Sequence, residues 1–139
     1  MSEPIKCFFV EFVAEKSTAT ESVWRRTDTG EEFSYLSEVP VSGMWFAHWF
    51  ENAWHPQLGT GKFLIVKTPG GDWMIDSNCR NCTIPGDRDQ EKHHCWIIHG
   101  TPPDITVDKN GVTCGAGAGS FMPANGSWHG FLRNGFLVE

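Results

Sequence analysis

Apolar residues in the first half of the chain fall into short runs separated by polar or glycine-containing connections. Residues 5–13 are rich in β-branched and aromatic side chains, which is typical of a strand. Residues 23–36 predict a hairpin that turns at Asp28-Thr29-Gly30, because Asp and Gly tolerate the left-handed backbone of such turns. A short helix over 31–38 is the alternative. Residues 62–76 predict a second hairpin, with Pro and two adjacent glycines at its turn.

Residues 43–54 have the spacing that favours a helix. Trp45 and Trp49 are four residues apart, and so are Phe46 and Phe50, which would place two aromatic ridges along one side of a helix. The same aromatic content is also compatible with a strand. Core packing is the simplest role for these rings, whichever element carries them.

Three Asn-Gly pairs interrupt apolar segments in the second half of the chain, at 110–111, 125–126 and 134–135. Asn-Gly is a strong hairpin signal because both residues accept positive φ in a type I′ turn. The three pairs therefore predict successive hairpins, and the first would place Val107 opposite Cys114. The expected fold is a single β-rich α+β domain, with an antiparallel meander and one short aromatic helix.

Composition is consistent with one domain and narrows the class of partner. The 139 residues are 40% hydrophobic, which is enough for one real core. Seven tryptophans and ten phenylalanines accompany a single tyrosine, so large rings dominate the core or an exposed binding face. The net charge of −6 and the sequence pI near 5.4 exclude a basic, phosphate-neutralising surface. A protein partner is expected and nucleic acid is not.

The N-terminal apolar run is too short and too acidic for a signal peptide or a membrane span. We therefore expect no membrane partner and a location in the cytosol, where reducing conditions disfavour disulfides. Cys7 lies inside this run, and we interpret it as a small buried hydrophobe on a strand.

The other cysteines lie close together with two histidines, and this group is the strongest chemical signal in the chain. Its members are Cys79, Cys82, Cys95 and Cys114, with His93 and His94 beside the third. A Cys-x-x-Cys turn lets two sulfurs face one tetrahedral ion. Four thiolates, or three with an imidazole from His93, His94 or His129, would close a structural zinc site. The spacing differs from a standard zinc finger, so buried thiols and redox chemistry stay as alternatives.

A nucleophilic site is a further alternative, because a thiolate can be activated by a nearby imidazole and an orienting carboxylate. The candidates are Cys82 or Cys114 as nucleophile, His94 or His129 as base, and Asp76 or Asp104 as orienting group. No local signature selects among them.

Several strings in the chain resemble those of a small family of proteins encoded by tailed bacteriophages and prophages. They are RRTDTGEE, GMWFAHW, GDWMIDSNCRNCT, HHCW, GTPPDITVDKNGVTCGAGAGS and HGFLRNG. The likeness begins at about Trp24 and covers more than three quarters of the chain. It divides the single domain into an N-terminal strand with a polar connection, 1–22, and a family-like region, 23–139.

The resemblance also bears on the metal ligands. It implies that Cys82, Cys95, Cys114 and His129 belong to recurring motifs, whereas the position of Cys79 is often not cysteine. Three thiolates with His129, or with His94, are then favoured over four thiolates. No activity is implied by the resemblance.

These observations predict a phage-encoded accessory protein with a structural zinc site that acts by binding a protein. Its partner would be a host factor, a defence system or the virion, and its location the cytoplasm of the infected host or the virion. One alternative is a small zinc- or cysteine-dependent hydrolase or transferase that uses Cys82, His94 and His129. A capsid or tail component is the other alternative.

Overall fold

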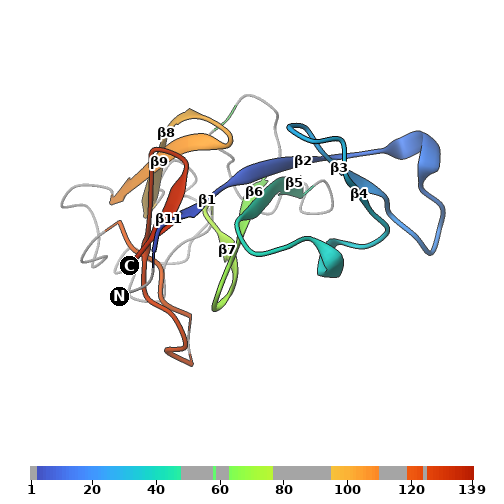
Figure 1. The fold of residues 1–139 in the computed structure, drawn as a ribbon. Coiled ribbons are helices and arrows are strands. Elements are labelled where there is room, and N and C mark those ends of the chain that lie inside the picture. The colour runs from blue at the N-terminus through green and yellow to red at the C-terminus, as the bar shows by residue number, and fades with distance from the viewer. Residues whose placement is uncertain (1–2, 48–57, 59–62, 77–94, 110–118, 124) are drawn as a thin grey trace, which may run out of the picture.

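The computed structural model of the chain consists mainly of short strands joined by turns (Figure 1). It describes residues 3–47, 58, 63–76, 95–109, 119–123 and 125–139. This described part is β-rich, as the sequence predicts, and its only helical elements are two short 3-10 helices, η1 (Ala14–Lys16) and η2 (Leu36–Glu38). Within it, no helix has the length and apolar character needed to cross a membrane.

A six-stranded mixed sheet forms the larger part of the described structure. Its strands, in spatial order, are β4 (Glu32–Phe33), β3 (Trp24–Arg26), β2 (Phe8–Phe12), β5 (Gly43–Ala47), β6 (Phe63–Thr68) and β7 (Gly71–Met74). The β2–β5 pair is parallel and all the other neighbours are antiparallel. The hairpins predicted at Asp28–Gly30 and within 62–76 are confirmed as β3–β4 and β6–β7.

Two smaller sheets lie together beyond one end of this sheet, where Figure 1 shows β8, β9 and β11. The first contains β1 (Ile5–Lys6), β11 (Phe136–Val138) and β10 (Phe131–Arg133), and the second contains β8 (Trp96–Thr101) and β9 (Asp104–Lys109). The predicted hairpin at 134–135 is confirmed, because Asn134 and Gly135 join β10 to β11 with φ of 50° and 79°. The Asn125-Gly126 turn is closed by an antiparallel bridge between Phe121 and Gly130.

The strand predicted over residues 5–13 is divided at Cys7 between two sheets. The Cys7 N–H donates to the carbonyl of Gly135 at 2.8 Å, whereas the Phe8 N–H donates to the carbonyl of Ser42 at 3.2 Å. The Cys7 side chain is 3% exposed within an apolar cluster, as its sequence context predicts. Desolvation there raises the pKa of Cys7 to about 12, so the thiol stays protonated at neutral pH.

Apolar clusters cover both faces of the six-stranded sheet, because successive residues of a strand point to opposite sides. We call the face that packs toward β1 and β8–β11 the inner face, and its opposite the outer face. Met44, Phe46, Leu64, Val66 and Trp73 lie on the inner face. The outer face carries Phe8, Val10, Trp24, Phe33, Trp45, Phe63 and Ile65, with Leu36 and Met74 packed against them.

The helix predicted over 43–54 is wrong for residues 43–47, which form β5. Four of these five residues are buried, because β5 is covered on both faces. A strand buried on both faces lacks the apolar-polar alternation that identifies strands in a sequence. The aromatic residues within 43–47 therefore belong to a strand that is covered on both faces. Residues 48–54 lie outside the described part.

The meander predicted for the second half of the chain does not include all the strand pairs that the structure shows. Strand β9 pairs with β8, which precedes it, through a turn at Pro102-Pro103, and Val107 lies opposite Ile98. The predicted hairpin at Asn110-Gly111 and the predicted neighbour Cys114 lie outside the described residues. The parallel β2–β5 pair and the division into three sheets were not expected from turn signals, which report only on neighbours along the chain.

Candidate functional site

Two members of the predicted metal site fall within the described structure. Cys95 is fully buried immediately before β8, and His129 is exposed just before β10. The other candidates lie outside the described residues: Cys79, Cys82, His93, His94 and Cys114. Among the described residues alone, no group of three or more His, Cys, Asp or Glu side chains is placed to hold a metal ion. The predicted zinc site therefore stays a prediction.

Ser120 connects the two segments that carry these candidates. The indole N–H of Trp96, the residue after Cys95, donates to the Ser120 carbonyl at 3.0 Å. Nε2 of His129 lies 2.9 Å from the Ser120 hydroxyl. The other ring nitrogen of His129, Nδ1, has no hydrogen-bond partner in the described structure. A histidine held through one nitrogen with the other available is the usual arrangement of a metal ligand, or of a catalytic base.

Aromatic packing positions the Cys95 and Ser120 segments. The rings of Trp73 and Trp96 meet edge to face with centroids 5.5 Å apart, and Phe121 stacks on Trp73 at 5.3 Å. Such pairs add about 0.5–1.5 kcal/mol beyond the area that they bury. The cluster joins β7, β8 and the segment after Gly119, so it positions Cys95 and Ser120, and the Ser120 hydroxyl in turn contacts His129.

The two carboxylates considered as orienting groups have other surroundings. Asp76 is buried and accepts a hydrogen bond from the Leu64 N–H at 2.9 Å, which satisfies a backbone donor at the start of β6. Asp104 is exposed, with its carboxylate 3.9 Å from the ammonium of Lys6. The candidate nucleophiles Cys82 and Cys114 lie outside the described residues, so the Cys-His-Asp arrangement stays a prediction.

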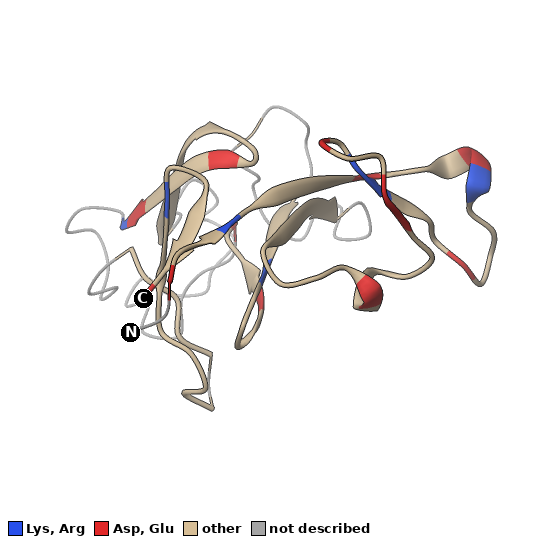
Figure 2. Cartoon of the chain, in the orientation of Figure 1, with Lys and Arg blue, Asp and Glu red and all other residues tan. Residues whose placement is uncertain are grey.

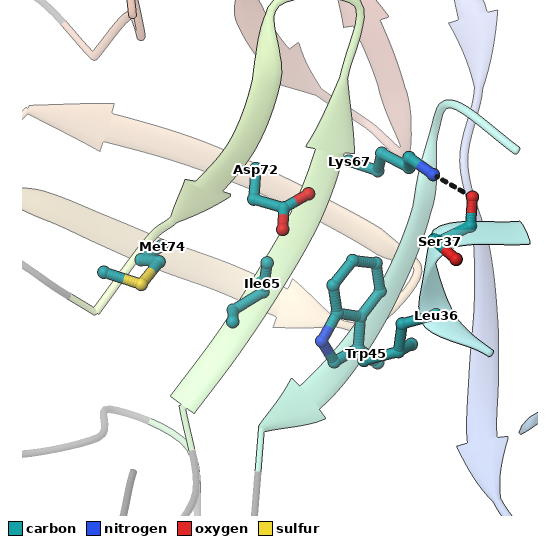
Figure 3. Close-up of a pocket in the computed structure, with 7 residues that line it drawn as sticks. All are labelled: Leu36, Ser37, Trp45, Ile65, Lys67, Asp72 and Met74. Atoms are coloured by element: carbon teal, nitrogen blue, oxygen red, sulfur yellow. Dashed lines mark hydrogen bonds between the residues drawn. The ribbon is translucent and has the colours of Figure 1, made fainter. Parts of the chain in front are cut away.

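A pocket on the outer face is a second candidate site, and the sequence reasoning did not identify it. Its volume is about 440 Å³. It lies between η2 and strands β5, β6 and β7 (Figure 3). Its lining residues are Leu36, Ser37, Trp45, Ile65, Lys67, Asp72 and Met74. The five lining residues from the strands belong to two adjacent rows across the sheet, so the hydrogen-bonded ladder sets their positions.

The first row forms an apolar floor. Trp45 lies opposite Ile65, and Ile65 lies opposite Met74. The Trp45 side chain is 2% exposed, and its indole Nε1 is buried without a hydrogen-bond acceptor in the described structure. Figure 3 shows this nitrogen on the edge of the ring that faces Ile65. A buried donor without an acceptor costs about 1–3 kcal/mol.

The second row carries two opposite charges that do not form an ion pair. Lys67 lies opposite Asp72 in the β6–β7 ladder. The Lys67 ammonium turns toward η2, where it donates to the carbonyls of Ser37 at 3.1 Å and Val39 at 2.6 Å. No hydrogen bond or ion pair involves the Asp72 carboxylate in the described structure. Partial desolvation raises the pKa of Asp72, and the charge of Lys67 opposes this shift.

The charge distribution differs between this pocket and the strands at the far end of the sheet. Figure 2 shows acidic positions on η2 and β7 around a basic position on β6, and both signs interleaved along β2–β4. There Arg25 is paired with Glu11 and Glu32, and Arg26 with Asp28. The strands at the far end therefore neutralise their charges internally, whereas the pocket leaves one carboxylate unpaired.

Part of the pocket could have been found in the sequence. The predicted hairpin over 62–76 brings Lys67 and Asp72 together, because both flank its turn. The four-residue spacing favours a helix around Trp45, and that prediction does not place Trp45 beside Ile65. The contribution of η2 depends on a long-range contact that no local pattern encodes.

Comparison of the chain with protein-family models, with curated proteins and with solved structures gives no significant match. The two candidate sites are therefore interpreted from their own geometry.

Proposed function

We propose that this chain is a phage-encoded accessory protein that acts by binding another protein through the outer-face pocket. The observation that carries this proposal is the pocket itself, which combines an apolar floor with an unpaired carboxylate at its edge. Its partner would be a host factor, a component of a defence system or the virion. The phage origin rests on the sequence resemblance described above.

An apolar floor with polar groups at its edge is the usual anatomy of a protein-protein contact. Residues that dominate binding energy cluster in pockets shielded from water. The ladder positions of Trp45, Ile65 and Met74 make this floor rigid before any partner arrives, which lowers the ordering cost of association. The Lys67 bonds to two backbone carbonyls hold η2 at the wall of the pocket in the same way.

We propose in addition that zinc organises the second half of the chain. The ligands would be Cys82, Cys95, Cys114 and His129, with Cys79 and His94 as the alternative members. The described residues fit such a role, because Ser120 holds His129 through Nε2 and leaves Nδ1 available. With four protein ligands the ion would act as a structural cross-link.

Partner binding is tested by affinity capture from bacterial cells infected with the phage that encodes the chain. Met74→Arg places a charged, longer side chain at the edge of the pocket. Met122→Arg makes the same change at an exposed methionine elsewhere, which is 45% exposed. We expect mass spectrometry to identify a protein retained by the wild type and by Met122→Arg but lost with Met74→Arg. Equal capture by all three proteins would overturn the pocket as the contact.

The zinc site is tested by metal analysis of the purified chain. We expect one zinc ion per chain, loss of zinc in Cys82→Ser and retention in Cys79→Ser. Removal of the metal by a chelator should unfold the second half of the chain, because structural zinc contributes directly to folding. A protein that folds without metal and binds no zinc contradicts this part of the proposal.

A zinc- or cysteine-dependent hydrolase or transferase is the second candidate function. The observation that favours it is the exposed imidazole of His129, whose Nδ1 has no partner in the described structure. A thiol activated by this histidine would be alkylated rapidly near neutral pH, because a neighbouring imidazole lowers thiol pKa values. Slow alkylation of every cysteine in the native protein would exclude a cysteine nucleophile.

A further inference from the structure

The outer-face pocket leaves one charged group without a counter-ion. The Asp72 carboxylate lies beside the apolar row and opposite Lys67, yet it makes no hydrogen bond or ion pair in the described structure. An ionised carboxylate can accept several hydrogen bonds. Asp72 is exposed to solvent, so its carboxylate can meet a cationic group that enters the pocket from outside, and such an exposed pair is worth about 0–1 kcal/mol, or at most about fivefold in affinity.

Lys67 does not supply that donor, and it does not offer an equal site for an anion. Two of its three N–H donors are engaged by the carbonyls of Ser37 and Val39. Figure 3 shows its ammonium directed toward Ser37, whereas the Asp72 carboxylate extends over the middle of the pocket. The recognising charge in the pocket is therefore negative, in agreement with the net charge of −6 of the chain.

The row next to Asp72 suits an aliphatic chain that ends in a charge. Met74 is half-buried and Ile65 is 3% exposed, so Met74 supplies most of the open apolar surface beside the Trp45 ring. Lysine and arginine bury their methylene stems along apolar surfaces while their charged heads stay at a polar edge. Met74 is unbranched, so it can adjust to such a stem.

Trp45 provides a second indication that the pocket takes a ligand. Its side chain is almost fully buried, and its indole N–H has no acceptor in the described structure. The nitrogen faces the Ile65 side of the pocket. A peptide carbonyl that enters beside Ile65 would satisfy this donor and remove its desolvation cost.

We propose that the outer-face pocket binds a lysine or arginine side chain presented by the partner protein, with its cationic head on Asp72 and its stem on the Ile65–Met74 row. The backbone carbonyl of the bound segment accepts the Trp45 indole N–H. This inference rests on the proposed function, since it names the chemistry of the partner at the same pocket.

The test uses the full-length protein labelled with nitrogen-15 and short capped peptides. The probe is acetyl-Ser-Leu-Lys-Leu-Ser-amide, and its analogues carry arginine, norleucine or glutamate in place of lysine. The indole cross-peak of Trp45 is assigned as the one lost in Trp45→Phe. We expect the lysine and arginine peptides to shift this peak saturably. Norleucine keeps the stem without the charge, and we expect it to bind about fivefold more weakly.

Variants isolate the role of the carboxylate. Asp72→Asn keeps the shape of the side chain and should weaken the lysine peptide about fivefold, to the level of the norleucine peptide. Asp108→Asn removes the same charge from an exposed site on β9 and should change nothing. Asp72→Lys should reverse the preference, so that the glutamate peptide binds better than the lysine peptide.

Three results would overturn the inference. They are an unshifted Trp45 peak with the lysine peptide, equal affinities of the lysine and norleucine peptides, and a Trp45 peak that moves only with protein concentration. The last would assign the pocket to a second copy of this chain. If any of them occurs while Met74→Arg still loses the captured protein, the protein-binding function stands. Only the proposal that the pocket binds a lysine or arginine side chain is then wrong.

Discussion

The two faces of the six-stranded sheet arise from the same strands but have different surroundings. On the inner face, Leu64, Val66 and Trp73 lie in a cluster that includes residues of β8, β9, β10 and β11. On the outer face, Trp45 and Ile65 are also buried, but Met74 beside them is only half-buried and a pocket remains. Alternation along one strand thus places a core and a candidate binding surface back to back. The elements that cover each face decide which one it becomes.

The contrast extends to two buried indole groups. Trp73 on the inner face and Trp45 on the outer face each bury an Nε1 donor that lacks an acceptor in the described structure. The Trp73 ring is stacked on Phe121 and meets Trp96 edge to face, so aromatic packing offsets the lost hydrogen bond. Trp45 lines the pocket, where an incoming group can supply the acceptor.

The largest expected difference in stability is between substitutions of two adjacent β7 residues, whose side chains point to opposite faces of the sheet. Trp73→Ala should lower the free energy of unfolding by about 3–5 kcal/mol, because it removes a fully buried ring and leaves a cavity. Met74→Ala should cost about 1 kcal/mol, since its side chain is half-buried at the pocket. Urea denaturation measures both. Equal losses would show that the outer face is packed as tightly as the inner one.

The buried thiol of Cys7 on the inner face should make the free energy of unfolding fall at alkaline pH. The pKa of Cys7 is raised by burial from 9.0 to about 12, so the unfolded chain ionises first. The stabilising contribution of the protonated thiol is complete below about pH 9 and is lost as the pH rises toward the folded-state pKa. The loss has an upper limit of about 4 kcal/mol.

The measurement compares the free energy of unfolding of the wild type with that of Cys7→Ala from neutral to alkaline pH. Other groups that ionise at alkaline pH are present in both proteins and cancel in the difference. We expect the advantage of the wild type to shrink as the pH rises. Parallel profiles for the two proteins would place the thiol in a more solvated environment than the inner face provides.

The smallest expected effect on stability comes from the Asp72 carboxylate on the outer face. The pKa of Asp72 is raised by desolvation, so its ionisation disfavours the folded state as the pH rises above the ordinary value of 3.8. Asp72→Asn should therefore be slightly more stable than the wild type at pH 7, by less than about 1 kcal/mol, and equal to it in strong acid.

Asp28→Asn is the matched control, and its expected change in stability at pH 7 is opposite in sign to that of Asp72→Asn. Hydrogen bonds from the Arg26 guanidinium lower the pKa of Asp28, so its contribution to stability is present above pH 3.8 and is lost as the pH falls through the lowered value. Thermal unfolding of both variants at neutral and acid pH measures the effect. Changes of the same sign in the two variants would contradict the unpaired state assigned to Asp72.

Local turn chemistry was readable in the sequence because it depends on a few adjacent residues. The turns at Asp28–Gly30 and at Asn134–Gly135 occur where Asp, Asn and Gly allow the required backbone. The burial of Cys7 followed from its apolar neighbours in the same way. Part of the candidate site was equally accessible, since the β6–β7 hairpin pairs Lys67 with Asp72.

The sequence by itself determined that the chain is β-rich and where several of its hairpins turn, and it named the cysteines and histidines that are candidate metal ligands. Only the tertiary structure decided that residues 43–47 form a strand, because burial on both faces removes the alternation that marks one. It also decided the parallel β2–β5 pair, the bridge from Ser120 to Trp96 and His129, and the pocket beneath η2. These features join residues far apart in the chain, and their energies depend on packing that no local pattern contains.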